Sequence, residues 1–237
     1  MRALVCLPTY DERENLEPML RALAEVLGPD DRVLVIDDDS PDGTGALADR
    51  LAAELPFVDV LHRARKEGLG RAYLAGFRVA LEQGAELVLE MDCDFSHDPQ
   101  DVPRLIAAAA DADVVLGSRY VPGGGVRDWG LVRRSISRAA SLYTRLLLMP
   151  VQDATSGFKC FRRTVLERLD LDAITSRGYM FQIETTFRAR RAGFRVVEIP
   201  ITFADREIGG SKMSRSIVLE AIWRVPALRL AALRGRV

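Results

Sequence analysis

Short, largely apolar runs alternate with stretches of helical spacing through the first half of the chain. The apolar runs suit buried strands, and they occupy residues 3–7, 33–36, 57–61, 87–91 and 114–117. Helical spacing or helix-capping residues fill the intervals, at residues 14–27, 44–55, 68–83 and 99–110. Strands that alternate with helices predict a doubly wound α/β sheet, mainly parallel, with helices on both faces.

The pattern changes after residue 117, where a glycine-rich loop is expected over residues 118–130. Further helices are expected at residues 131–149 and 181–192, and a strand at residues 195–203. Residues 153–162 should form a loop followed by a strand, and residues 206–216 a Gly/Ser/Lys loop. A final helix over residues 217–233 should be interrupted at Pro226. We therefore expect one α/β domain over residues 1–214 and an amphipathic C-terminal helix over residues 215–237.

Charge divides the chain, although its net charge is only −1. Residues 1–118 carry 24 acidic and 11 basic side chains, and residues 119–237 carry 10 and 22. This division suggests acids for a metal and bases for an anionic partner. No apolar run approaches the length of a membrane span. The three scattered cysteines suggest neither a zinc site nor a set of disulfides, so a reducing cytoplasm is expected.

Acidic residues follow three of the predicted strands. Glu12 lies beyond the first strand, residues 37–39 follow the second, and Asp92 and Asp94 follow the fourth. Because ligands bind at the carboxyl ends of parallel strands, these groups should line one site. Two carboxylates one residue apart can share Mg²⁺ or Mn²⁺, although either motif alone could be an ordinary acidic loop.

Several common motifs are missing from the chain. The first strand is not followed by G-x-G-x-x-G, and neither a P-loop nor G-x-S-x-G occurs, which argues against a dinucleotide fold, a P-loop nucleotidase and this type of hydrolase. His62 and His97 lack metal-ligand spacing, so both are interpreted as structural.

Taken together, the motifs resemble family 2 glycosyltransferases of the GT-A fold. The resemblance rests on PTYDEREN at residues 8–15, the aspartates at 37–39, DCD at 92–94 and GSRY at 117–120. Segments similar to the dolichyl-phosphate (polyprenyl-phosphate) mannose synthase branch lie at residues 123–125, 133–137, 155–158, 178–184 and 206–213. The resemblance extends from residue 3 to about residue 214.

This resemblance implies GDP-mannose as donor, a polyprenyl monophosphate lipid as acceptor and Mg²⁺ or Mn²⁺ as cofactor. The implied donor-binding residues are Pro8, Tyr10, Glu12, Ile36, Asp38, Asp92, Cys93, Asp94, Arg119, Arg206 and Lys212. The implied metal ligands are Asp92, Asp94 and Ser96, with water supplementing the weak serine ligand. The acceptor phosphate would contact Arg119, Arg133 and Ser137, and the implied catalytic residues are Asp94, Arg119 and Arg133.

The acceptor is already a nucleophile at neutral pH, so single displacement with inversion needs no general base. We expect a peripheral protein on the cytoplasmic face of a membrane and no nucleic-acid partner. The leucine- and arginine-rich tail either lies on anionic lipid or packs on the domain, and a separate membrane subunit is a further conceivable anchor.

Three other functions compete with this interpretation. A polyprenyl-phosphate glucose synthase would use UDP-glucose, but the tail motif and the lack of membrane helices favour mannose. A receiver-type signalling domain would be about half as long and would leave the basic half unexplained. A lipid-binding scaffold that lost catalysis disagrees with the intact Asp92 and Asp94.

Overall fold

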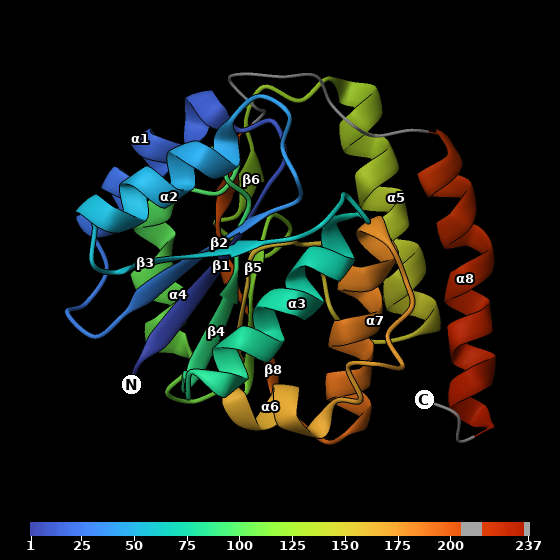
Figure 1. Cartoon of the computed structure of the whole chain (residues 1–237). Helices are drawn as coiled ribbons and strands as arrows, with labels where there is room; N and C mark the ends of the chain where they lie inside the picture. Colours follow the sequence, from blue (N-terminus) through green and yellow to red (C-terminus); the bar gives the residue numbers. More distant parts are fainter. Residues whose placement is uncertain (205–214, 235–237) are drawn as a thin grey trace.

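The computed structural model describes residues 1–204 and 215–234, and within them a central sheet lies between two layers of helices (Figure 1). The seven strands of this sheet have the order β3-β2-β1-β4-β7-β5-β8. They are β1 (Ala3–Thr9), β2 (Arg32–Asp37), β3 (Val58–His62), β4 (Leu87–Glu90), β5 (Val114–Ser118), β7 (Lys159–Arg162) and β8 (Val196–Pro200). A second, two-stranded sheet pairs β6 (Gly125–Val126) with β9 (Thr202–Phe203).

The helices cover both faces of the large sheet. They are α1 (Arg13–Ala24), α2 (Thr44–Glu54), α3 (Leu69–Glu82), α4 (Val102–Ala108), α5 (Leu131–Leu147), α6 (Arg163–Arg168), α7 (Gly178–Arg191) and α8 (Arg215–Leu233), with a 3-10 turn η1 at Pro99–Asp101. Helices α1, α2 and α4 lie on one face and α3, α6 and α7 on the other, with α5 and α8 beyond α7 (Figure 1).

Two hydrophobic cores result from the alternation of side chains along each strand. In β1, Val5 and Leu7 pack towards α1 and α2, whereas Leu4 and Cys6 pack towards α3. Successive residues of a strand point to opposite faces, so a strand covered on both faces is apolar throughout. This explains the continuous apolar runs from which the strands are predicted.

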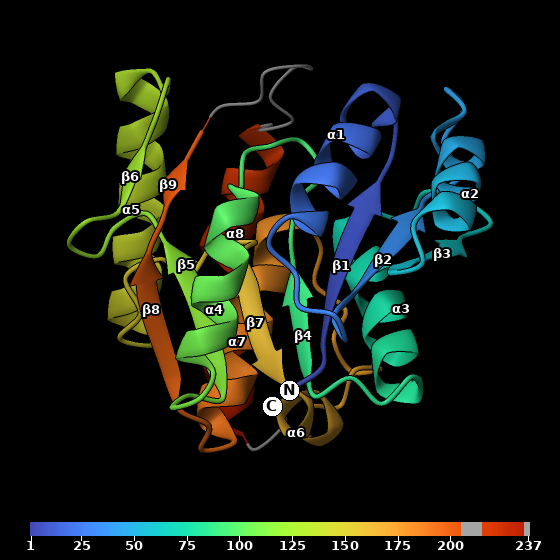
Figure 2. The same cartoon turned by 90° about the vertical axis from the view of Figure 1, so that its left-hand side faces the viewer.

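The predicted α/β fold with a mainly parallel sheet is confirmed. Strand β7 is the exception, because it runs antiparallel between β4 and β5. Its apolar pattern would be the same in either direction, so the pattern could not reveal this. The antiparallel direction places the start of β7, rather than its end, beside the carboxyl ends of the parallel strands (Figure 2).

Three local predictions need correction, and one short element was missed. The strand expected at residues 195–203 divides into β8 and β9, and β9 leaves the large sheet to pair with β6, inside the predicted loop at residues 118–130. The expected interruption at Pro226 is wrong, because α8 continues through it. A proline removes one helical hydrogen bond, and a long helix packed on α5 and α7 can lose it. The short helix α6 was not predicted.

In the described parts of the chain, none of the helices combines the length and the apolar character that crossing a membrane requires.

Candidate active site

The acidic motifs meet where the order of the parallel strands reverses. Strand β1 pairs with β2 on one side and with β4 on the other, all in parallel. The segment after β1 holds Tyr10 and Glu12, the segment after β2 holds Asp38, and the segment after β4 holds Asp92 and Asp94. The predicted grouping of these motifs at one sheet edge is therefore present, at the position where α/β sheets bind ligands.

Asp92 is held from two directions. The Tyr73 hydroxyl of α3 donates a hydrogen bond to Asp92 Oδ1 at 3.3 Å. The Asp92 backbone N–H donates to His97 Nδ1 at 3.1 Å, and the His97 ring stacks on Phe158 with centroids 4.8 Å apart. Burial and the nearby Asp92 carboxylate raise the pKa of Tyr73 well above its usual value, so the phenol remains a donor.

The contacts of His97 agree with its interpretation as a structural residue, and they support the acidic loop itself. Tyr73 was not predicted as a site residue, because it belongs to a helical pattern 19 residues before Asp92. Only the packing of α3 against β4 brings the two together. Its ring is also stacked with Phe181 of α7, at a centroid distance of 6.1 Å.

The residues of this loop fit a hard cation. Asp94 is buried, and its Oδ1 accepts a hydrogen bond from the Ser96 backbone N–H at 3.1 Å. The Ser96 hydroxyl oxygen is also buried and has no hydrogen-bond partner within residues 1–204 and 215–234. No group of three His, Cys, Asp or Glu side chains in the described chain could enclose a metal. Asp92, Asp94 and Ser96 could therefore supply part of a coordination shell that a diphosphate and water would complete.

The side chains expected to contact a nucleoside each have a partner elsewhere in the chain. Lys66 Nζ lies 3.3 Å from the centre of the Tyr10 ring. The Glu12 carboxylate accepts a hydrogen bond from Asn15 Nδ2 at 2.8 Å. Asp38 forms an ion pair with Arg63, while burial raises its pKa above the usual value. Neither Lys66 nor Arg63 was predicted to belong to this region.

Ile36 departs from its predicted role. Its side chain is fully buried and points towards α3, where a Cβ on Gly76 would lie 2.5 Å from Ile36 Cδ1. Only the main chain of Ile36 can therefore reach a nucleoside. Cys93 is also buried, while Pro8 is partly exposed in β1 beside Ile36.

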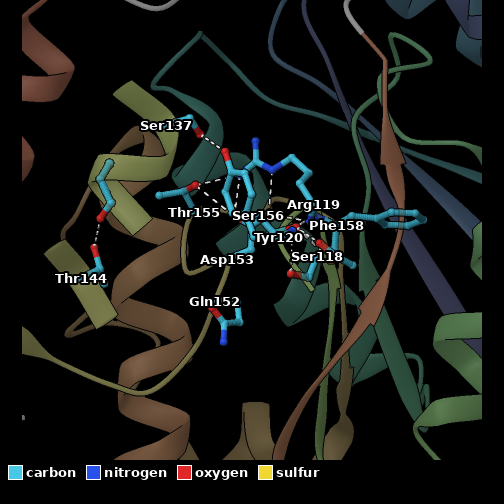
Figure 3. A network of polar contacts seen from close by, with 12 residues as sticks. Ser118, Arg119, Tyr120, Ser137, Thr144, Gln152, Asp153, Thr155, Ser156 and Phe158 are labelled. Carbon is cyan, nitrogen blue, oxygen red and sulfur yellow. Dashed lines mark hydrogen bonds and ion pairs between the residues drawn. The ribbon is translucent and has the colours of Figure 1, made fainter. Parts of the chain in front are cut away.

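Arg119 follows β5 and is largely engaged inside the protein (Figure 3). Its Nε and Nη2 donate to the two carboxylate oxygens of Asp153 at 2.7 and 2.6 Å, and Nη2 also donates to Thr155 Oγ1 at 2.8 Å. Burial disfavours the guanidinium charge, but Asp153 outweighs it and raises the pKa of Arg119. Asp153 therefore occupies the paired N–H groups of Arg119, and a phosphate that contacts Arg119, as predicted, would have to do so through Nη1.

The other predicted acceptor residues do lie near Arg119. The Tyr120 hydroxyl donates to Ser137 Oγ of α5 at 2.6 Å (Figure 3). The Arg133 guanidinium lies 4.2 Å from the centre of the Trp129 ring, and that of Arg119 lies 5.5 Å from it. Trp129 was not predicted, because a spacing of four residues to Arg133 brings side chains together only within a helix, and Trp129 precedes α5.

A glycine allows the chain to fold back at this point. A Cβ on Gly124 would lie 2.4 Å from the carbonyl oxygen of Ser118, so only glycine permits this approach. The next residues pair with β9, with Gly125 N–H donating to Ile201 O at 3.0 Å and Arg127 N–H to Phe203 O at 2.8 Å.

Arg206 and Lys212, predicted to close over the donor, lie outside the described residues.

A buried pair of opposite charges lies below the acidic loop. Glu90 and Lys159 face each other across β4 and β7. Burial raises the pKa of Glu90 to about 7 and lowers that of Lys159 to about 8. Lys159 Nζ donates to the Gln182 carbonyl oxygen at 2.7 Å and to Thr185 Oγ1 at 3.2 Å.

An α/β sheet with an acidic strand edge and a neighbouring arginine cluster is the arrangement expected of a nucleotide-sugar transferase. Residues 4–170 match the model of glycosyl transferase family 2, and the chain belongs to this family.

Relatives cover nearly the whole chain. It is 52% identical over 233 residues to the undecaprenyl-phosphate mannosyltransferase of Micrococcus luteus, covering 98% of this chain and 96% of that protein. It is 52% identical over 227 residues to the polyprenol monophosphomannose synthase of Mycolicibacterium smegmatis, covering 94% and 85%.

A solved structure supports the fold. The mannosyltransferase PcManGT from Pyrobaculum calidifontis, in complex with GDP-Man and Mn²⁺, aligns with a TM-score of 0.65 at 20% identity, covering 98% of this chain and 64% of that one.

Proposed function

We propose that the protein transfers mannose from GDP-mannose to a polyprenyl monophosphate and inverts the configuration at the sugar carbon. The observation that carries this proposal is the adjacency of two unlike sites along one sheet edge. The acidic loop after β4 suits a metal-bound diphosphate, and the arginine and hydroxyl cluster after β5 suits a second phosphate. The names of the two relatives at 52% identity support mannose and a polyprenyl phosphate.

The proposed reaction needs no proton transfer. With a second pKa of about 6, the acceptor phosphate is mostly a dianion at neutral pH. One of its oxygens forms a bond to the anomeric carbon while the bond from that carbon to the diphosphate breaks, and the electron pair leaves with GDP. The histidines are consistent with this, because His97 already accepts a hydrogen bond from Asp92 and His62 lies 2.8 Å from Asp49.

Asp92, Asp94 and Ser96 would hold Mg²⁺ or Mn²⁺, which would offset the charge that develops on the departing diphosphate. The buried, unsatisfied Ser96 hydroxyl supports this assignment. Arg206 and Lys212 would add positive charge near the diphosphate, a role that rests on the sequence motif alone.

We further propose that the outer surface of α5 and α8 contacts the membrane that holds the acceptor. The two helices pack against each other at one end of the molecule (Figure 1). Exposed leucines on them lie among exposed arginines; these are Leu131, Leu142, Leu146, Leu230 and Leu233 with Arg134, Arg138, Arg145, Arg229 and Arg234. Apolar side chains beside cationic ones suit an anionic lipid surface.

Liposome sedimentation tests this surface. Replacing Leu142 and Leu146 together with serine should lower binding to anionic vesicles more than it lowers turnover of a short acceptor in detergent. Unchanged sedimentation would show that the membrane contact lies elsewhere.

The central test offers the purified protein either radiolabelled GDP-mannose or UDP-glucose, together with a short polyprenyl phosphate and Mg²⁺ or Mn²⁺. We expect label in the lipid only from GDP-mannose, and a product with the inverted, β linkage. Transfer from UDP-glucose instead would support a glucose synthase. Lipid binding without transfer from either donor would support a scaffold that lost catalysis.

A further inference from the structure

Trp129 connects the two arginines of the acceptor region. It lies between β6 and α5, and its ring packs edge-on against Phe203 with centroids 5.5 Å apart. The Arg133 guanidinium lies 4.2 Å from the ring centre and that of Arg119 lies 5.5 Å away. A cation over an aromatic face is attracted to it, so the indole is a shared support for two cations that come from different elements.

The position of Trp129 is set by backbone pairing. Strand β6, two residues long, is joined to β9, and the hydrogen bond from Arg127 N–H to Phe203 O is 2.8 Å long. The indole therefore lies beside Phe203 of β9 and close to both arginines, and the Arg119 guanidinium is also 5.4 Å from the centre of the Phe203 ring. These contacts favour a binding role, because a side chain that is already positioned loses little entropy when a ligand binds.

The indole N–H is buried and makes no hydrogen bond to any residue in the described ranges 1–204 and 215–234. Indole nitrogen is only a donor, and buried tryptophans usually find an acceptor for it. This unsatisfied buried donor lies beside two guanidinium groups, an arrangement that suits an anionic ligand as its acceptor.

We propose that Trp129 is a further binding residue for the acceptor, whose phosphate monoester group accepts a hydrogen bond from the indole Nε1–H. This rests on the proposed function and adds a contact to it. The ring holds Arg133 and Arg119 in position, and the N–H supplies a donor that Arg119 cannot supply with the groups committed to Asp153. A phosphate fits better than a carboxylate because it offers three oxygens to donors that converge from the β5 loop and α5.

The test uses Trp223→Phe as the reference protein, because the chain has only two tryptophans and Trp129 then remains as the sole indole. Adding Trp129→Phe keeps a ring but deletes the N–H. The KM for a short polyprenyl phosphate should rise about tenfold relative to the reference, the scale of one hydrogen bond to a charged group. GDP binding by calorimetry should change less than about twofold, and thermal melting should stay within a few degrees. An unchanged KM, or equal losses in KM and GDP binding, would overturn the proposal.

Fluorescence separates this proposal from the proposed function. In the Trp223→Phe protein, titration with a short polyprenyl phosphate should change the Trp129 emission, and the corresponding polyprenyl alcohol should not. This fluorescence titration does not require turnover, so it tests the Trp129 contact even if the protein transfers no sugar. If the alcohol and the phosphate act alike, or neither acts, Trp129 does not bind the phosphate group.

Discussion

Removing the Asp153 carboxylate should destabilise the protein strongly. Asp153 is completely buried and accepts three hydrogen bonds from Arg119, one of them from its backbone N–H at 2.9 Å. In Asp153→Ala the Arg119 guanidinium stays buried without its counter-charge. Breaking a buried ion pair by deleting one partner costs roughly 3–5 kcal/mol. For a domain of this size, roughly 2–4 °C are lost per kcal/mol, so Tm should fall by about 6–20 °C.

Differential scanning calorimetry of the purified variant measures this directly. The matched control is Glu17→Ala, which removes an exposed carboxylate that pairs with Arg21 at 2.6 Å one helical turn away. Such a pair contributes less than about 1 kcal/mol, so its Tm should move by at most a few degrees. If Asp153→Ala shifted Tm no more than Glu17→Ala, Arg119 would not depend on Asp153, and its paired N–H groups would be available for phosphate after all.

Three further results are expected. Asp94→Ala should abolish transfer and leave Tm nearly unchanged; near-normal turnover at saturating Mn²⁺ would place Asp94 outside the site. Tyr73→Phe keeps the stacked ring but removes the hydroxyl that orients Asp92, so the affinity for Mn²⁺ in the presence of GDP should fall by about tenfold in calorimetry. Equal affinity in Tyr73→Phe and wild type would mean that the hydroxyl has no such effect. Burial lowers the pKa of Lys159 from its usual value of 10.5 to about 8 in the folded protein. Between pH 8 and 10.5 the unfolded chain therefore binds more protons than the folded protein, so the contribution of Lys159 to the free energy of unfolding should increase as the pH rises through this range. Lys159→Gln should lack this increase. If the Tm of Lys159→Gln and of the wild type changed equally between pH 8 and pH 10, the pKa of Lys159 would not be lowered.

The strands and the acidic edge could be predicted from the sequence because they depend on local patterns. A strand covered on both faces must be apolar at every position, and the residues after it must be able to turn and to meet solvent. Glu12, Asp38, Asp92 and Asp94 follow such strands, and the parallel topology places them at one edge. The family resemblance added the expected roles of the arginines, which spacing alone does not reveal.

The partners of these residues depend on contacts between segments far apart in the chain. Asp153 meets Arg119 only because β7 runs antiparallel and brings its preceding loop to the edge of the site. Tyr73 reaches Asp92, and Trp129 reaches both arginines, through packing of helices and pairing of short strands. Sequence determined the order of strands and helices and the chemistry available at the sheet edge, since both follow from hydrophobic burial and local backbone preferences. Only the tertiary structure decided which charges neutralise one another and which donors remain for a ligand, because strand direction and side-chain distances have no local signature.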